Sequence, residues 1–268
     1  MKTTKTSMMM AVLMAAALPF TAQALTIGFE EVEGYEAGNL AGQPSSGTQW
    51  ALTNGSGNDV NVAAGVGNGG GAGLVNTSSG SGSNFVFYGF NTTNADLGFT
   101  FDSTSSILQY SFDWRPTQDL DGGNGQILFD FMIGSNADTG SNAALALRIH
   151  SSGRFQANDG GTLRTVDGLF SETGTYQTIS GTINYATNQY TVFVGNTQLF
   201  TTNNEGNLGF QNVDSDNAYI RFSNLRGGSD SAQWREWNMD NISVIPEPST
   251  LALLGIALGA VAMFRRRK

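Results

Sequence analysis

The sequence predicts an all-β protein in which two antiparallel sheets pack face to face. The first observation is strict alternation, because the apolar Leu108, Tyr110, Phe112 and Trp114 are separated by single polar residues. A period of two is typical of half-buried antiparallel strands. The second observation is composition: Gly, Asn, Ser and Thr crowd residues 25–245 and give this region poor helix propensity. The shared register of Trp114 with Leu108 and Phe112 predicts that its ring lies in the core.

Further segments show the same alternation and are separated by short turns. The segments lie at residues 127–133, 145–149, 177–185, 190–194 and 220–222, and the turns at 151–153, 159–161 and 195–196. These turns are short enough for hairpins. We expect roughly 12 to 16 short strands, a number that requires two packed sheets. The chain has no periodic internal repeat, which argues against a solenoid.

Residues 54–84 differ from the rest because Gly, Ser, Asn and Val dominate them. A flexible linker is one interpretation of this composition. Val60, Val62, Leu74 and Val75 nevertheless keep a strand-like spacing. Short strands joined by glycine-rich loops are therefore the favoured interpretation.

The N-terminal segment has the three-part layout of a secretion signal. Lys2 and Lys5 precede an apolar core over residues 8–20, and Ala22-Gln23-Ala24 supplies the small residues of a signal peptidase site. We expect a signal helix that is removed after Ala24. The predicted organisation is a signal peptide at 1–24, a β-sandwich domain at 25–245 and a sorting tail at 246–268.

The C-terminal tail has the layout of a stop-transfer segment. It consists of Pro246, Glu247 and Pro248, an uncharged apolar run over 251–264, and the cations Arg265, Arg266, Arg267 and Lys268. Such a layout predicts a transmembrane helix with the cations on the cytoplasmic face. The run of about 14 residues is shorter than the roughly 18 to 20 of a full span, which suits a transient anchor in the inner membrane. The prolines favour an extended backbone before the helix.

This tail resembles the PEP-CTERM sorting tail of Gram-negative bacteria. The resemblance implies that an exosortase-like enzyme recognises Pro246, Glu247 and Pro248 and removes the tail. It further implies an exported protein whose final destination is the cell surface or the extracellular matrix, where the domain is either released or attached.

The region between the two ends is acidic and the chain has no cysteine. Seven arginines face 21 acidic residues in residues 25–245, which gives a formal charge near −14. This charge argues against binding to nucleic acids or anionic polymers, and it suits neutral polymers and divalent cations. Without disulfides, a large core has to stabilise the exported domain.

The middle of the chain resembles the concanavalin-like jelly rolls of lectins and carbohydrate-binding modules. The resemblance rests on the opening Gly28-Phe29-Glu30, the long block of hairpins, and the closing segment 237–244. It implies a sandwich associated with carbohydrate. The glucanase branch of that superfamily carries paired glutamates flanking an aspartate on one strand. Nothing here matches that pattern, since Glu31 and Glu33 lie in a loop-like acidic run.

No other catalytic motif is recognisable, so we expect a protein that is not an enzyme. The single histidine, His150, ends a predicted strand and is expected on the surface beside a turn. One histidine and no cysteine do not support the usual zinc sites or a Ser-His-Asp triad. Neither a Gly-x-Ser-x-Gly elbow nor a phosphate-binding Gly-Lys-Ser/Thr is present.

Two places are candidates for a structural calcium ion. Asp119, Asp121 and Asn124 lie in a glycine-rich turn that resembles the start of a calcium loop but lacks the later bidentate glutamate, so an acidic hairpin loop is the alternative. The second candidate pairs Glu30 with Asp240, because the first strand of a jelly roll lies beside the last. Two buried carboxylates repel unless a cation lies between them.

The last predicted strand needs an irregularity. Trp237 and Met239 fall on one face of a regular strand, whereas Ile242 and Val244 fall on the other. A β-bulge near Asp240-Asn241 restores a clean alternation.

Four aromatic residues are candidates for stacking on sugar rings. Trp50, Tyr88, Trp234 and Trp237 do not sit squarely within apolar runs, and outward-facing rings on a rigid sheet present a π face to sugar CH groups. The alternative for each of the four is a core position.

Four function classes remain. The first is a carbohydrate-associated surface or matrix protein, and the second is a purely structural or adhesive surface protein without a small ligand. The third is a polysaccharide hydrolase or lyase, which requires a catalytic pair in a cleft. The fourth is ice binding, which requires regular threonine arrays, whereas pairs such as Thr92-Thr93 and Thr201-Thr202 are scattered. Two or more aligned aromatics on a concave sheet would separate the first from the second.

Overall fold

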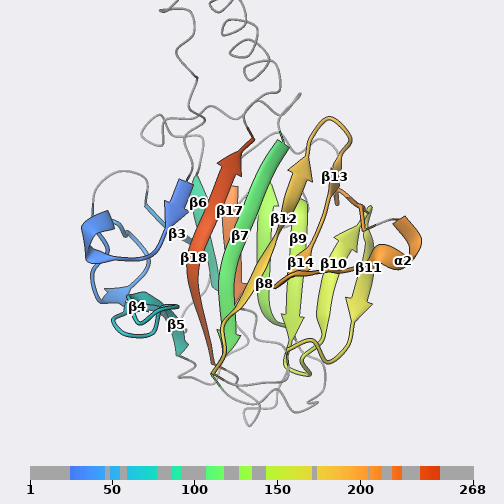
Figure 1. The fold of residues 1–268 in the computed structure, drawn as a ribbon. Helices are drawn as coiled ribbons and strands as arrows, with labels where there is room; N and C mark the ends of the chain where they lie inside the picture. The colour runs from blue at the N-terminus through green and yellow to red at the C-terminus, as the bar shows by residue number, and fades with distance from the viewer. Residues whose placement is uncertain are drawn as a thin grey trace, which may run out of the picture.

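The computed structural model confirms the predicted fold class, a two-sheet antiparallel sandwich of the jelly-roll kind (Figure 1). It describes residues 25–45, 49–54, 59–77, 86–91, 107–117, 127–134, 143–170, 174–204, 206–212, 219–224 and 236–247. The predicted signal helix and transmembrane helix lie outside these residues. Within the described part of the chain, no helix has the length and apolarity that crossing a membrane requires.

The first sheet contains eleven strands and lies at the front of Figure 1. Its main order is β15-β14-β12-β7-β18-β5-β4-β2, while β1 pairs with β18 and β13 joins β12 to β16. The strands are β1 (Leu25–Ile27), β2 (Gly38–Asn39), β4 (Asp59–Ala63), β5 (Gly73–Thr77), β7 (Ile107–Pro116), β12 (Gln177–Asn184), β13 (Gln189–Tyr190), β14 (Phe193–Val194), β15 (Thr197–Gln198), β16 (Leu208–Gly209) and β18 (Trp237–Pro246).

The second sheet contains seven strands in the order β11-β10-β9-β8-β17-β6-β3. They are β3 (Ala51–Asn54), β6 (Val86–Asn91), β8 (Ile127–Gly134), β9 (Ala143–His150), β10 (Phe155–Asp159), β11 (Thr162–Val166) and β17 (Tyr219–Asn224). The helical elements in the described residues are the 3₁₀ turn η1 (Glu31–Glu33) and the four-residue α2 (Thr201–Asn204). The strand count exceeds the expected 12 to 16 because several strands are only two residues long.

The glycine-rich region 54–84 contributes β4 and β5 to the first sheet. Val60, Val62 and Leu74 are buried, which supports the short-strand interpretation for this part of the region. In β4 the buried Val60 and Val62 alternate with Asn61, so one face of the strand packs on the core. Residues 55–58 and 78–85 lie outside the described residues.

An aromatic cluster fills the space between the sheets. Phe129 of β8 lies at its centre, and its ring centroid is 4.9 Å from Trp237, 5.9 Å from Phe112, 6.0 Å from Trp114 and 6.3 Å from Phe222. These rings come from both sheets, so the cluster joins the two layers. Trp114 is fully buried, which confirms its predicted core position.

Strand β18 contains the predicted bulge. Its register with β7 shifts between Asp240 and Ser243, and Asn241 adopts a left-handed backbone with φ of 53°. The extra residue turns Ile242 and Val244 to the same face as Trp237 and Met239, as the predicted bulge requires. All four apolar side chains are therefore buried.

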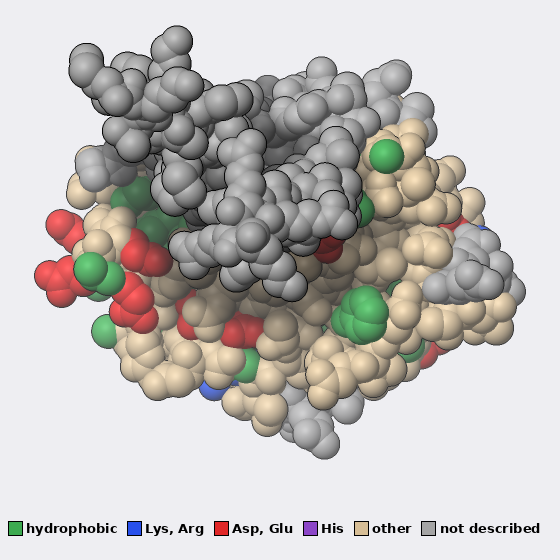
Figure 2. Space-filling model, turned by 45° about the horizontal axis from the view of Figure 1, so that its top comes forward, with side chains coloured by type: hydrophobic (Ala, Val, Ile, Leu, Met, Phe, Trp, Pro, Cys, Tyr) green, Lys and Arg blue, Asp and Glu red, His purple; other side chains and the backbone are tan. Residues whose placement is uncertain are grey.

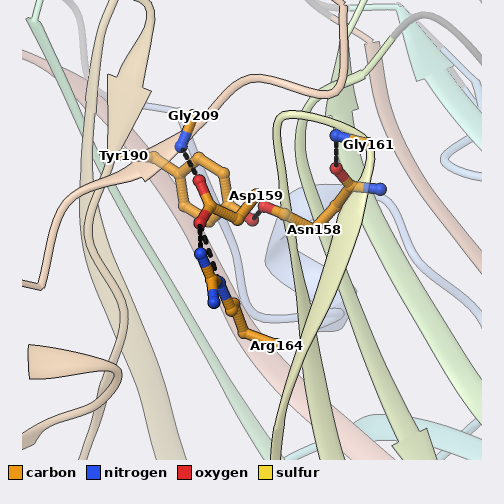
Figure 3. Close-up of polar contacts among 6 residues, drawn as sticks. All are labelled: Asn158, Asp159, Gly161, Arg164, Tyr190 and Gly209. Carbon is orange, nitrogen blue, oxygen red and sulfur yellow. Dashed lines mark hydrogen bonds and ion pairs between the residues drawn. The ribbon is translucent and has the colours of Figure 1, made fainter. Parts of the chain in front are cut away.

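Polar contacts connect the two sheets where β10 of the second sheet meets β16 and β13 of the first (Figure 3). Asp159 accepts hydrogen bonds from Arg164 Nε at 2.8 Å and from the backbone N–H of Gly209 at 2.8 Å. The hydroxyl of Tyr190 donates to the backbone carbonyl of Asn158. Burial raises the pKa of this hydroxyl, which is therefore neutral and able to donate.

Truncation of the central aromatic ring should strongly destabilise the domain. We expect Phe129→Ala to lower the free energy of unfolding by about 3–5 kcal/mol, because it leaves a cavity among rings from both sheets. Chemical denaturation followed by tryptophan fluorescence measures this change. Leu163→Ala on β11, where the side chain is 42% exposed, is the matched control and should cost less than about 1 kcal/mol. Equal losses in the two variants would contradict a core centred on Phe129.

Candidate functional site

A shallow groove crosses the outer face of the first sheet. It has a volume of about 360 Å³ and is lined by residues of β7, β12, β14 and β18. The lining consists of Gln109, Tyr110, Ser111, Ser180, Gly181, Thr182, Phe193, Ser243 and Ile245. The described lining therefore combines hydroxyl and amide groups with two apolar side chains at its sides, and it contains no charged residue.

The strand register explains why these side chains gather. Phe193 pairs with Ser180, Ser180 with Ser111, and Ser111 with Ser243, so one cross-strand row runs over four strands. Thr26 of β1 extends the row beyond Ser243. Residues paired across antiparallel strands point to the same face, so the row forms a polar strip on the outside of the sheet.

A carboxylate cluster lies further along the same strands. Asp113 of β7 pairs with Asp240 of β18, and both side chains are buried despite their position on the outer face. Asp113 accepts hydrogen bonds from Thr178 Oγ1 at 2.6 Å and from Asn68 Nδ2 and Asn241 Nδ2, both at 2.9 Å.

The carboxylates hold the glycine-rich loop at residues 64–72 against the sheet. Asp240 accepts from the backbone N–H of Asn68 at 2.8 Å, and Glu30 accepts from the backbone N–H of Ala72 at 3.0 Å. A Cβ at Gly71 would lie 2.1 Å from Glu30 Oε1, so only glycine allows this close approach. The prediction that the first and last strands adjoin is confirmed, because β1 pairs with β18.

Arg115 and Tyr176 hold the same loop at Val66. Arg115 lies 4.5 Å from the centre of the Tyr176 ring, and its Nη2 donates to the carbonyl of Val66 at 3.3 Å. The Tyr176 hydroxyl donates to the same carbonyl. Burial raises the pKa of Tyr176 to about 12, so the hydroxyl stays protonated and the contact persists across the physiological pH range.

The surroundings of Asp240 disfavour the ionised form of its carboxyl group. Burial above all, together with the neighbouring carboxylates of Asp113 and Glu30, raises its pKa to about 6, although the N–H groups of Asn241 and Asn68 oppose the shift. The protonated form is therefore favoured by folding. Divalent cations favour the ionised form instead.

The carboxyl and amide oxygens here are chemically suited to calcium, but their present partners are N–H and O–H donors. Throughout the described ranges, no group of three or more His, Cys, Asp or Glu side chains is arranged to hold a metal ion. The cluster as it stands is a hydrogen-bonded clamp on the loop. Calcium at Glu30 and Asp240 stays a prediction.

A second hollow lies at the acidic edge of the molecule. Figure 2 shows acidic side chains gathered at the left of that view, on the side where the N-terminal loop lies in Figure 1. Glu30, Glu31 and Glu36 line a hollow of about 530 Å³ there. Glu33 caps the 3₁₀ turn by accepting from the backbone N–H of Glu30 at 3.2 Å, and it also accepts from that of Gly28 at 2.9 Å, so its carboxylate has structural partners.

Two of the four predicted stacking residues are in the core, which corrects that prediction for them. Trp50 and Trp237 are 1% and 0% exposed, so neither presents a ring face to solvent. Trp50 donates from its indole N–H to Tyr35, and Trp237 packs on Phe129. Trp237 shares the inward face of β18 with the buried Met239.

Several predicted residues lie outside what the structure describes. These are Trp234, the side chain of Tyr88, the calcium-loop candidates Asp119, Asp121 and Asn124, and the tail residues Pro248, Arg265, Arg266, Arg267 and Lys268. His150 does end β9, but it is buried rather than on the surface, and its Nε2 lies 2.6 Å from Gln156 Oε1. The polar partner on β10 makes this burial tolerable.

Sequence reasoning missed the groove residues. Phe193 is an aromatic residue on the outer face, and the alternation that buries Tyr190, Val192 and Val194 would have placed it there. Ser111, Ser180 and Ser243 could not be grouped without the register, because they are far apart in the sequence.

The sorting motif begins inside the folded domain. Strand β18 runs to Pro246, and the backbone N–H of Glu247 donates to Ile107 O at 2.8 Å. Residues 244–268 match the PEP-CTERM protein-sorting motif. The chain carries a PEP-CTERM tail. This motif indicates an exported surface protein and implies processing by an exosortase.

Comparisons of the whole chain add information on the fold alone. No curated protein sequence matches it. The cellulose induced protein Cip1 is similar in structure, with a TM-score of 0.51 and 14% identity over 82% of this chain and 96% of Cip1. A sialidase (TM-score 0.48, 13% identity) matches 85% of this chain, which spans only 19% of the sialidase. The alginate lyase AlgAT5 (TM-score 0.47, 11% identity) matches over 82% of this chain and 97% of its own.

The stability of the mature protein should fall as the pH rises from about 4 to 7. The pKa values of Asp240 and of Asp130, a buried residue of β8, are raised from 3.8 to about 6, mainly by burial. Folding therefore favours their protonated forms, and this contribution is complete below about pH 4 and is lost as the pH rises through 6. Melting temperatures at half-unit pH steps measure the effect. Asp240→Asn should reduce the pH dependence; an unchanged slope in this variant would contradict the role of Asp240.

The same melting measurements, repeated with added Ca²⁺ or a chelator, test the calcium prediction. If Glu30 and Asp240 bind Ca²⁺, the ion stabilises their ionised forms, so added Ca²⁺ raises the melting temperature at pH 7 and a chelator lowers it. The Asp240→Asn variant should lose this response. An unchanged melting temperature of the native protein on chelation rules the calcium site out.

Proposed function

We propose that this chain is an exported surface or matrix protein whose β-sandwich binds extracellular polysaccharide without cleaving it. The observation that carries the binding proposal is the groove over β7, β12, β14 and β18. The PEP-CTERM motif supports export. The exopolysaccharide matrix of a biofilm is the corresponding environment.

The chemistry of the groove suits a sugar polymer. Sugars carry hydroxyl groups at their edges and CH groups on their faces. Ser111, Ser180 and Ser243 each offer one donor and two acceptor lone pairs, and Gln109 adds an amide. The half-buried ring of Phe193 offers an apolar surface at the edge of this strip. A few polar groups beside an apolar wall are the usual composition of a ligand site.

The absence of charge in the described lining favours binding over catalysis. Cleavage of a glycosidic bond by the usual mechanism requires two carboxyl groups facing each other across the bond. The carboxylates of Asp113 and Asp240 lie further along the strands and are occupied with the loop at 64–72. They also repel anionic polymers, so we propose an uncharged ligand.

The proposed sorting route starts with removal of residues 1–24 by signal peptidase. The apolar run at 251–264 then holds the chain in the inner membrane with Arg265–Lys268 on the cytoplasmic side. An exosortase acts near residues 246–248 and leaves the domain at the surface or in the matrix.

Mass spectrometry of the protein recovered from surface and medium fractions tests this route. We expect an N-terminus at Leu25 and a C-terminus near Glu247, because both ends are removed during export. The intracellular precursor from the same cells is the control. A surface form that retains residues 251–264 would exclude processing of the tail, and a cytoplasmic form with Met1 intact would exclude export.

Binding of the mature protein to a glycan array tests the ligand proposal. We expect binding to neutral polysaccharides, and Phe193→Ala should weaken it roughly two- to tenfold through loss of ring contact. Leu163→Ala removes an exposed apolar side chain on the other sheet and should leave binding unchanged. No binding to any neutral or acidic polymer would leave the purely structural or adhesive function as the better proposal.

A further inference from the structure

The first residues of the sorting motif are held in the sheet. Ile245 pairs with Gln109 and Pro246 with Leu108, so β18 follows β7 to its first residues. Proline has no N–H to donate, and the next donor along the strand is Glu247. Its N–H donates to Ile107 O at 2.8 Å and closes the ladder.

The side chain of the motif glutamate is also engaged. Gln109 Nε2 on β7 donates to Glu247 Oε1 at 3.1 Å. The two residues are 138 positions apart in the sequence, so only the folded sheet brings them together. Backbone and carboxylate of Glu247 are thus both bound to β7.

An enzyme that recognises Glu247 has to compete with the contacts that this residue already makes with β7. Recognition of an extended segment uses its backbone N–H and C=O groups and places its side chains in pockets. The N–H and the carboxylate of Glu247 are both occupied by the domain itself. We propose that the contacts of Glu247 with Gln109 and Ile107 form a clasp, which has to open before the processing enzyme binds the glutamate.

The burial of neighbouring residues limits how much of β18 can separate from β7. Val244 is 3% exposed and is anchored in the core, whereas Ile245 is 37% exposed. Strand ends with exposed hydrogen bonds open locally at low free-energy cost. Opening is therefore confined to residues 245–247, and the rest of the sandwich stays folded. The clasp makes the rate of processing depend on the fold of the domain.

The test measures processing of the full-length chain in a bacterium whose exosortase processes it, by pulse labelling and the mass of the product. This inference rests on the proposed exosortase route. The proposed clasp limits the rate of processing by its opening, so the loss of one exposed hydrogen bond predicts that Gln109→Ala is processed roughly two- to tenfold faster. Gln109→Glu places two like charges together and should also be faster. Gln109→Lys forms an ion pair with Glu247 and should be no faster than the native chain.

Gln49→Ala is the matched control. Gln49 is likewise a glutamine with an exposed side-chain hydrogen bond, but its partner is Pro44 O, at 3.1 Å, rather than a residue of β18 or the tail. Its processing should match that of the native chain. Melting temperatures of the Gln109 variants check that the domain still folds, and the opposite effects expected of Glu and Lys distinguish the clasp from a general loss of stability.

Three results decide the inference. Faster processing of Gln109→Ala and Gln109→Glu supports the clasp. Native rates in all Gln109 variants, or slower processing of Gln109→Ala, would overturn it; the slower rate would mean that Gln109 presents the glutamate to the enzyme. A native chain that is never processed would instead overturn the sorting route on which the inference rests.

Discussion

The pairing of β18 with β7 is the contact on which the other features depend. It aligns Asp240 with Asp113, Ser243 with Ser111 and Ile245 with Gln109 along one outer face. From one end to the other, this single ladder carries the carboxylate cluster, the groove and the start of the sorting motif. The inner face of the same two strands supplies Phe112, Trp114 and Trp237 to the aromatic core. The pairing of β18 with β7 therefore contributes to the core on one face and positions the polar groups on the other.

The bulge in β18 allows both roles. On either side of it, Trp237, Met239, Ile242 and Val244 point inward while Asp240 and Ser243 lie on the outer face, although the two halves are out of phase in the sequence. The extra residue also brings Asn241 Nδ2 to Asp113. A regular strand would place Ile242 and Val244 in water and remove a donor from a buried carboxylate. Both costs favour the irregular strand.

Local sequence patterns predicted the two sheets, but they did not predict which distant residues the folded sheets bring close together. The alternation at Leu108–Trp114 and the mismatch between Met239 and Ile242 were enough to predict the sandwich and the bulge. The proximity of Glu30 and Asp240 followed from the expected neighbours of the first and last strands. By contrast, Trp50 and Trp237 were candidates for the surface because neither sits squarely within an apolar run, whereas packing between the sheets buries both rings. The serine row depends on the register of strands that lie far apart in the sequence, such as those of Ser111 and Ser243, which no local spacing encodes.

The central position of β18 has a consequence for how the domain forms. Its partner β7 precedes it by more than 100 residues in the chain, so the middle of the first sheet is completed by its last strand. Contacts of such long sequence separation make folding slow. During translocation in the N-to-C direction, the earlier strands reach the outside before the one that fills the gap between β7 and β5. The open sheet would then expose two unpaired strand edges, a template for association with other chains, until β18 arrives. Slow delivery of β18 would therefore favour aggregation of the exported domain.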